Sequence, residues 1–418
     1  MDKFVVRGGK PLTGELEARG SKNAALPVIA ACILSSGRCA IENVPRLRDT
    51  ATMRAMLRKF GATVDEDKAG TATIDGATFR DAFAPYELVR TMRASFFVLG
   101  PLLARFGWAK VSLPGGCAIG ARPVNLHLDG LTKMGADIQL VSGYVEAKVQ
   151  KLHGADIYLE FPSVGATENL MMAASLAEGR TAIKNAAREP EIVDLQKFLR
   201  AMGARVEGAG TDEIRVEGKN ELGAARHVVI PDRMETATLL LAGLITGGKV
   251  TVTRAMPQHL DAFLEKVREM GAEVDVSDNS ISAQARGRLK ACDITSLPYP
   301  AFPTDLQPHA MAALSIADGT SRITETIFER RFTQVPELVR MGADIEVESN
   351  VAVVQGVPNL RGAQVMAPDI RGGAALVLAA LAARGETHIL RVYHIDRGYD
   401  RLEERLAALG GDLARVPE

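Results

Sequence analysis

Basic side chains stand where several nonpolar helices are expected to begin, and there they could bind an anion. Lys22, Arg93, Arg233 and Arg371 each lie in or next to the first turn of such a helix. A positive charge is unfavourable at the positive end of the helix dipole, whereas phosphate and carboxylate groups bind there. Neighbouring Ser, Thr and Asp residues also fit ordinary helix capping, which is the simpler interpretation. The recurring charge favours a site for a multiply anionic ligand.

A glycine-rich run, Pro-Gly-Gly-Cys-Ala-Ile-Gly-Ala-Arg-Pro-Val at 114–124, carries Cys117. Its glycines and prolines are typical of an exposed loop. Lys110 and Arg122 lie close in the sequence, and positive neighbours lower a thiol pKa and raise its reactivity. Cys117 is therefore a candidate reactive thiol, and an incidental exposed cysteine is the alternative.

The C-terminal half adds further charged candidates. Asp305 stands at an expected helix start, and Arg331 follows about one strand later. Arg397 is next to a glycine, so it is expected on a loop that could close over a ligand. A surface ion pair between Arg397 and Asp396 or Asp400 is the alternative.

A sixfold repeat must position these residues. A charged amphipathic helix that ends in a glycine turn and a strand recurs every 68–74 residues. Glycine suits the end of a helix because it adopts a left-handed conformation at little cost. Such regular self-similarity predicts a repeat architecture. The turn glycines are Gly61, Gly135, Gly203, Gly271, Gly342 and Gly410.

A nonpolar helix recurs out of phase with the charged one, for example at 166–178 and 236–245. Helices that are nonpolar around most of their surface are normally buried. Each unit of about 70 residues is therefore expected to be an α/β module with one inner and one outer helix.

The termini indicate how the six units are grouped. Residues 1–21 resemble the end of a unit and are expected to complete the sixth one. Three units per domain give one domain at 22–230 and another from 1–21 plus 231–418, with a cleft between the domains that receives the anion. A continuous solenoid is the alternative.

The composition excludes several classes of function. The 418 residues include 50 Lys and Arg against 51 Asp and Glu, so the net charge of −1 predicts neither nucleic-acid binding nor attraction to an anionic membrane. The nonpolar stretches are too short to span a bilayer and the N-terminus lacks a signal peptide, so a cytoplasmic protein is expected.

The motifs favour no metal and no cofactor. Cys32, Cys39 and Cys292 have no zinc-like spacing and are expected in the core. Gly243-Leu-Ile-Thr-Gly-Gly-Lys-Val resembles a P-loop, but it ends a nonpolar helix and lacks the final Ser or Thr. The sequence also has no G-x-G-x-x-G motif for a nicotinamide cofactor.

Four motifs together resemble the enolpyruvyl transferases over essentially the whole chain. They are Lys22-Asn23, the cysteine run at 114–124, Phe302-Pro-Thr-Asp and Asp396-Arg-Gly-Tyr-Asp, in this order. The resemblance implies two inverse α/β barrel domains, each built from three βαβαββ repeats, with the active site in the cleft between them. It is strongest to the family members that use UDP-N-acetylglucosamine.

The resemblance also implies an activity and the residues that perform it. The enolpyruvyl group of phosphoenolpyruvate would pass to the 3′-hydroxyl of UDP-N-acetylglucosamine, with release of phosphate. Cys117 would donate a proton and react covalently with fosfomycin, and Asp305 would be the base. Lys22, Arg122 and Arg397 would bind phosphate, with Arg331 and Arg371 near the carboxylate. Further expected substrate-site residues are Asn23, Arg93, Pro123, Val124, Asn125, Leu126, Ser163, Val164, Gly165, Glu189, Ile327 and Asp369.

Two alternatives remain open. One is an enolpyruvyl transferase of the same fold that acts on 3-phosphoshikimate, and Cys117 argues against it because those enzymes lack such a loop. The other is a catalytically silent scaffold that binds a UDP-sugar or a partner protein. The presence of Lys22, Cys117, Asp305 and Arg397 together argues against a silent site.

Overall fold

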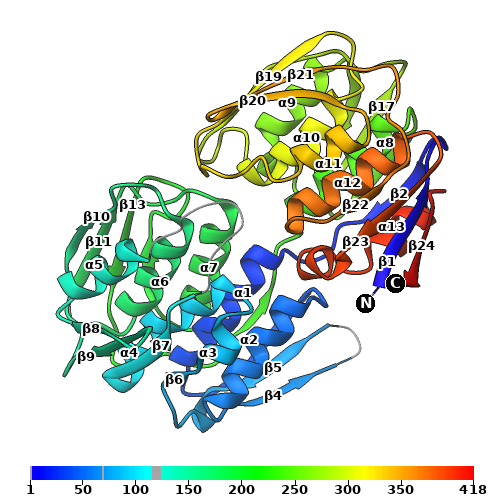
Figure 1. Ribbon diagram of the computed structural model, residues 1–418. Coiled ribbons are helices and arrows are strands. Elements are labelled where there is room, and N and C mark those ends of the chain that lie inside the picture. Colours follow the sequence, from blue (N-terminus) through cyan, green and yellow to red (C-terminus); the bar gives the residue numbers. More distant parts are fainter. Residues whose placement is uncertain (1, 68–69, 115–123) are drawn as a thin grey trace. The chain divides into compact units, whose positions relative to one another are not determined.

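The computed structural model describes residues 2–67, 70–114 and 124–418, which form two compact units (Figure 1). Among the described residues, the N-terminal unit comprises 20–67, 70–114 and 124–230. The C-terminal unit combines residues 2–19 with Pro231–Glu418. Each unit has its own hydrophobic core.

Within the part of the chain that the structure describes, each unit contains three four-stranded sheets, and all of these sheets have one topology. A parallel strand lies at one edge, and the other three strands pair antiparallel to one another. In the N-terminal unit the orders are β14(Arg226–Val228)–β3(Arg38–Glu42)–β5(Ala72–Asp75)–β4(Thr63–Glu66), β6(Phe83–Ala84)–β7(Trp108–Ser112)–β9(Tyr144–Lys148)–β8(Asp137–Val141) and β10(Asp156–Tyr158)–β11(Arg180–Lys184)–β13(Glu213–Glu217)–β12(Arg205–Glu207).

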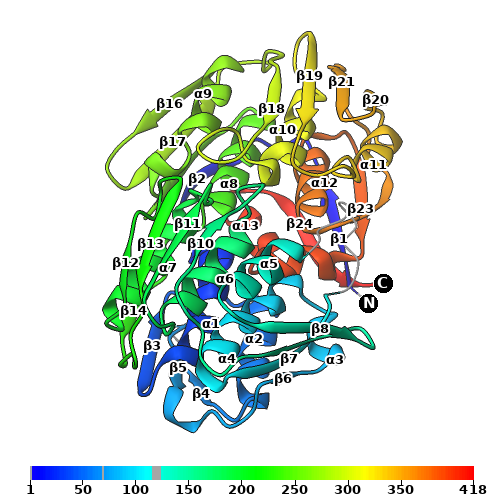
Figure 2. The same cartoon turned by 90° about the vertical axis from the view of Figure 1, so that its left-hand side faces the viewer.

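The C-terminal unit repeats this pattern. Its orders are β2(Thr13–Glu17)–β15(Lys249–Thr253)–β17(Ser280–Ala285)–β16(Ala272–Val276), β18(Ile294–Ser296)–β19(Thr320–Glu325)–β21(Val351–Gln355)–β20(Asp344–Glu348) and β22(Gln364–Met366)–β23(Glu386–Leu390)–β1(Asp2–Arg7)–β24(Asp412–Pro417). Figure 2 shows β1 between β23 and β24, where the N-terminal strand completes the last sheet.

The parallel edge strand links neighbouring sheets, because it follows one repeat in the sequence but joins the sheet of the next. The link closes on itself in each unit: β14 returns to β3, with His227 opposite Ile41, and β2 joins β15, with Gly14 opposite Val250. This cyclic exchange of strands explains why each unit contains a complete set of three repeats.

In the sequence, a nonpolar inner helix precedes the strand that pairs with the parallel edge strand of each sheet, and an amphipathic outer helix follows that strand. The inner helices are α1(Lys22–Ala31), α4(Leu99–Phe106), α6(Val164–Ala174), α8(Arg233–Ile245), α10(Gln307–Leu314) and α12(Ile370–Ala382). The outer helices are α2(Arg48–Lys59), α5(Asn125–Lys133), α7(Pro190–Ala201), α9(Asp261–Glu269), α11(Val335–Arg340) and α13(Leu402–Ala408). A short helix, α3(Tyr86–Val89), and six 3-10 helices complete the set within the described residues.

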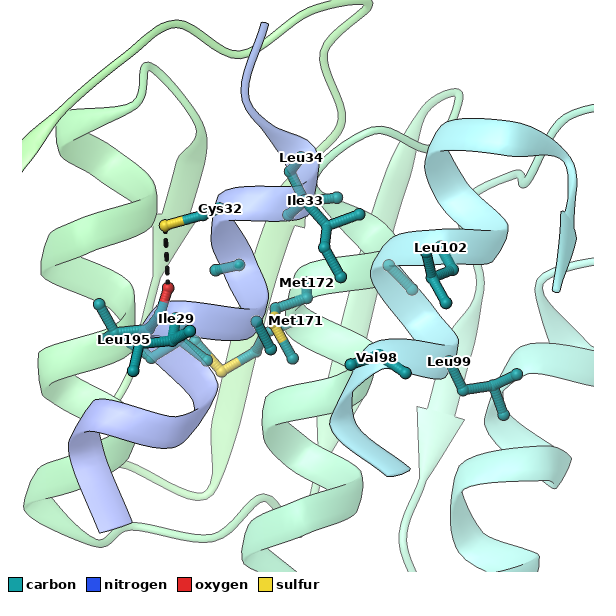
Figure 3. Close-up of a cluster of buried hydrophobic side chains, with 14 of the residues drawn as sticks. Ile29, Cys32, Ile33, Leu34, Val98, Leu99, Leu102, Met171, Met172 and Leu195 are labelled. Carbon is teal, nitrogen blue, oxygen red and sulfur yellow. Dashed lines mark hydrogen bonds between the residues drawn. The ribbon is translucent and has the colours of Figure 1, made fainter. Parts of the chain in front are cut away.

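The inner helices form the core of their unit. Every residue of α8 is buried, and α10 packs against both α8 and α12. Figure 3 shows the corresponding packing in the N-terminal unit, where nonpolar side chains of the α1 segment lie close to Met171 and Met172 of α6. The outer helices bury one face only; α9, for example, buries Phe263, Leu264 and Val267.

The six turn glycines have φ angles between 88° and 99°, as their place after each outer helix predicts. In chain order β18, α10, β19, α11, β20 and β21 give the expected βαβαββ pattern. The predicted fold class, two α/β units of three repeats each, is therefore confirmed.

Candidate active site

In the C-terminal unit, a carboxylate lies between two buried arginines. Asp305, in the 3-10 helix η5(Thr304–Leu306), accepts a hydrogen bond of 3.1 Å from Arg331 Nη2 on Oδ1 and one of 3.0 Å from Arg371 Nε on Oδ2. Both guanidinium groups are almost fully buried, whereas the Asp305 side chain is 30% exposed. Burial favours the neutral form of Arg371, but the interactions with Asp305, Tyr399 and Asp232 together outweigh it and raise the pKa of Arg371 above its usual value.

One nitrogen on each of these arginines still lacks an acceptor among the described residues. They are Arg331 Nε and Arg371 Nη1. A buried N–H without a partner costs about 1–3 kcal/mol. The cluster therefore retains buried positive hydrogen-bond donors, beside Asp305, that suit an anion.

Backbone contacts fix the start of α12, which carries Arg371. Asp369 caps this helix, and its Oδ1 accepts hydrogen bonds from the Arg371 and Gly372 N–H groups at 2.9 and 3.0 Å. Its other oxygen accepts a hydrogen bond from the Thr333 hydroxyl. Asp369, predicted as a site residue, thus has a clear capping role.

Glu325 connects two predicted residues, although the sequence analysis did not identify it. This buried carboxylate accepts hydrogen bonds from the Ile327 N–H at 2.8 Å and from the Thr304 hydroxyl at 2.9 Å. It therefore fixes the segment at Ile327 to the turn that carries Asp305. A glutamate that ends a strand gave no signal by which to choose it in advance.

Arg397 ends the 3-10 helix η6(Val392–Arg397) and lies between two acidic residues that other arginines engage. Arg415 donates to both oxygens of Asp396, at 2.5 and 3.1 Å, and Arg19 lies 2.8 Å from Asp400. These contacts hold the segment around Arg397 on both sides.

In the N-terminal unit, Lys22 begins α1 after the capping residue Ser21. Its Nζ lies 2.7 Å from Oδ2 of Asp49 in α2, and both side chains are buried. The positive charge at this helix start is thus paired with a carboxylate of the same chain. The sequence analysis did not predict this pair. The neighbouring Asn23 is partly buried.

The predicted UDP-sugar residues of the N-terminal unit lie on elements that pack together. Arg93 begins the 3-10 helix η3(Arg93–Val98), Val124 and Asn125 begin α5, and Ser163 caps α6. A Cβ at Gly165 would lie only 3.2 Å from Phe97 of η3 and 3.4 Å from His127 of α5. The starts of α5 and α6 and the end of η3 are therefore close. Val164 and Leu126 belong to the same helix starts.

Glu189 stands at the N-cap position of α7, next to a buried acidic residue that the sequence analysis missed. Glu168 of α6 is fully buried, and both of its carboxylate oxygens lack a hydrogen-bond partner among the described residues. Burial raises its pKa well above the usual range, and the charges of Glu191 and Glu189 add to this shift.

Three predicted residues, Cys117, Arg122 and Pro123, lie outside the described residues. The other cysteines are buried, as predicted, and burial raises the pKa of Cys292 to about 11. Among the described residues, no cluster of three His, Cys, Asp or Glu side chains suits a metal ion. Nor does any described helix combine the length and the nonpolar character that a membrane span needs.

The structure thus groups the predicted residues in two sets. The set in the C-terminal unit comprises Asp305, Ile327, Arg331, Asp369, Arg371 and Arg397; that in the N-terminal unit comprises Lys22, Asn23, Arg93, Val124, Asn125, Leu126, Ser163, Val164, Gly165 and Glu189.

Comparison with known proteins identifies the family. The profile of EPSP synthase (3-phosphoshikimate 1-carboxyvinyltransferase) matches residues 6–406. The chain is 54% identical to UDP-N-acetylglucosamine 1-carboxyvinyltransferase 1 of Symbiobacterium thermophilum, over 99% of this chain and 95% of the relative. It is 52% identical to the UDP-N-acetylglucosamine 1-carboxyvinyltransferase of Magnetococcus marinus, over the whole of both chains.

Solved structures agree. The enolpyruvyl transferase NikO from Streptomyces tendae superposes with a TM-score of 0.90 at 27% identity, over 100% of this chain and 99% of its own. An EPSP synthase from Acinetobacter baumannii shares the fold, with a TM-score of 0.77 at 19% identity over the whole of both chains. Because the family profile matches residues 6–406 and these relatives match over almost their whole length, the chain belongs to the UDP-N-acetylglucosamine 1-carboxyvinyltransferases, within the EPSP synthase family of enolpyruvyl transferases.

Proposed function

We propose that this protein transfers the enolpyruvyl group of phosphoenolpyruvate to the 3′-hydroxyl of UDP-N-acetylglucosamine and releases phosphate. This is the first committed step of peptidoglycan synthesis. The observation that carries the proposal is the identity of 52–54% over full length to transferases named for this acceptor. The cytoplasmic location expected from the sequence stays a prediction.

The reaction proceeds by addition and then elimination. In the addition, the sugar hydroxyl attacks C2 of phosphoenolpyruvate and gives its proton to a base, while an acid protonates the CH2 carbon. The product is a tetrahedral ketal. In the elimination, the new methyl group loses a proton, the double bond re-forms and the C–O bond to phosphate breaks. The site therefore needs an acid, a base and positive charge for two anionic groups.

The Asp305 cluster supports the binding of the donor. Asp305 is partly exposed and its orientation is fixed through both oxygens, so it can be held facing the sugar hydroxyl as the proposed base. Arg331 and Arg371 retain buried N–H groups without an acceptor among the described residues, which suits the donor's carboxylate. Arg397, Lys22 and Arg122 complete the proposed phosphate contacts, and Cys117 the proton donor.

The N-terminal unit supports the binding of the acceptor. The neighbouring starts of α5 and α6 carry backbone N–H groups of the kind that bind a diphosphate, and Arg93 is proposed to add a positive charge. Pro123, Asn125, Ser163 and Glu189 belong to this proposed acceptor set, and Ile327 of the C-terminal unit adds to it.

Phosphate release from phosphoenolpyruvate tests the proposal. Wild type is assayed with UDP-N-acetylglucosamine or 3-phosphoshikimate as acceptor, beside Cys117→Ser. Cys292→Ser is the matched control, because its buried thiol has a raised pKa and is not expected to react. Release only with the UDP-sugar, lost in Cys117→Ser and kept in Cys292→Ser, is expected.

Other outcomes have clear meanings. Release with 3-phosphoshikimate would replace the proposed acceptor, and no release with either acceptor would favour a silent scaffold. Mass spectrometry after exposure to fosfomycin should find one covalent addition in wild type and none in Cys117→Ser. An addition that persists in the variant would contradict the proposed role of this thiol.

A further inference from the structure

Tyr399 contacts all three inner helices of the C-terminal unit. Its hydroxyl lies 3.0 Å from Thr238 Oγ1 on α8 and 2.9 Å from His309 Nε2 on α10. Its ring lies 5.4 Å from the Arg371 guanidinium on α12. Because only 2% of Tyr399 is exposed, water does not replace these partners. One buried side chain therefore links the three helices beside the Asp305 cluster.

The direction of the hydrogen bonds follows from Thr238. The Thr238 hydroxyl donates its one proton to the Met234 carbonyl at 2.7 Å, so it can only accept from Tyr399. The Tyr399 oxygen accepts from His309 in the tautomer that carries its proton on Nε2. This hydrogen-bond network runs from His309 through Tyr399 and Thr238 to the backbone of α8, and each of the three side chains is neutral.

His309 stays neutral because of where it lies. It is fully buried, and burial lowers its pKa to about 3, with the charges of Arg371 and Arg331 contributing. Burial also raises the pKa of Tyr399, although the Arg371 charge opposes that shift. At the pH of any ordinary assay the hydrogen-bond network of His309, Tyr399 and Thr238 therefore does not ionise, and its geometry is constant.

Arg371 depends on this hydrogen-bond network for its orientation. Its Nε donates to Asp305 on one side, and its guanidinium lies against the Tyr399 ring on the other. We infer that Tyr399 and His309 are positioning residues, which hold Arg371 so that it orients the Asp305 carboxylate and receives the donor's anionic group. This inference rests on the proposed function for the identity of the donor.

Four variants separate positioning from simple core packing. Tyr399→Phe keeps the ring beside Arg371 and removes only the hydroxyl, and His309→Leu removes the donor at similar volume. His309→Gln keeps an N–H donor and serves as the conservative rescue. Tyr144→Phe, which removes a partly exposed hydroxyl in the N-terminal unit, is the matched control.

Two readouts are used for each variant: calorimetric affinity for phosphoenolpyruvate, and steady-state kinetics with both substrates. Tyr399→Phe and His309→Leu should each weaken phosphoenolpyruvate binding about tenfold, the effect of one lost hydrogen bond near a charge, and leave KM for the UDP-sugar unchanged. The double variant Tyr399→Phe/His309→Leu should bind phosphoenolpyruvate no more weakly than either single variant, because both residues act through one hydrogen-bond network. His309→Gln and Tyr144→Phe should match wild type.

The inference is overturned if Tyr399→Phe and His309→Leu lower the melting temperature but keep wild-type affinity and turnover, because the chain then only packs the core. It is also overturned if His309→Gln fails as badly as His309→Leu. Turnover by the wild type tests the proposed function. The affinities of the variants for phosphoenolpyruvate, relative to wild type, test the positioning role separately, even if no turnover is found.

Discussion

Lys22 Nζ lies 2.7 Å from Asp49 Oδ2, and both side chains are almost completely removed from solvent. A helix start that was expected to need an external anion thus has a carboxylate from the next helix of the same repeat. The proposed phosphate contact of Lys22 therefore takes place next to a fixed negative charge, which orients the ammonium group.

Replacement of Asp49 by Asn should destabilise the protein, because it leaves Lys22 buried beside a neutral amide. Breaking a buried ion pair on one side costs about 3–5 kcal/mol. Chemical denaturation of wild type and Asp49→Asn measures this cost. Asp65→Asn is the control in the same unit, since its pair with Arg38 is exposed on both sides and is worth at most about 1 kcal/mol. Equal stability of the two variants would contradict the structural role of Asp49.

Replacement of Arg331 or Arg371 by Lys should weaken use of phosphoenolpyruvate. Lysine keeps the charge, but it cannot donate to Asp305 and to a second anion with the fixed geometry of a guanidinium. A fall of about 10–100-fold in kcat/KM is expected for each variant, from the loss of a charged hydrogen bond. Arg340→Lys, whose side chain is exposed and paired with Glu337, is the control. Wild-type kinetics in Arg331→Lys and Arg371→Lys would remove both from the donor site.

Sequence patterns predicted those features of the molecule that local chemistry determines. The nonpolar helices are inside, the turn glycines have positive φ angles, and Lys22, Arg233 and Arg371 stand in the first turns of their helices. These properties depend on residues within one or two helical turns of each other.

Partners that are distant in the sequence were not predictable in this way. Asp305 pairs with residues 26 and 66 positions away, and Tyr399 meets His309 from a distance of 90 positions. Nothing in a single sequence says which carboxylate or hydroxyl the repeats bring together. The exchange of β2 and β14 between repeats is equally non-local.

Glu168 should make stability depend on pH, and Glu168→Gln should remove that dependence. Its pKa is raised in the folded protein, so the folded state binds the proton more tightly than the unfolded chain. Stability is then fully present below the unfolded pKa of about 4.3 and falls as the pH rises towards the folded value. Melting temperatures of wild type and Glu168→Gln should differ little at pH 4 and favour the variant at pH 8. Glu160→Gln, which alters an exposed residue, is the control. Parallel pH profiles for wild type and Glu168→Gln would show that Glu168 does not titrate in this way.

Arg415 should control the proposed phosphate contact of Arg397 without touching a substrate itself. It holds both oxygens of Asp396 from the last strand of the chain, and Asp396 is the residue before Arg397. Arg415→Lys keeps the charge but cannot grip both oxygens, so KM for phosphoenolpyruvate should rise about tenfold with KM for the UDP-sugar unchanged. Arg401→Lys is the matched control, because Arg401 lies in the same segment and pairs with Glu404 at the surface. If Arg415→Lys and Arg401→Lys gave the same KM as wild type, η6 alone would suffice to hold Arg397 in place.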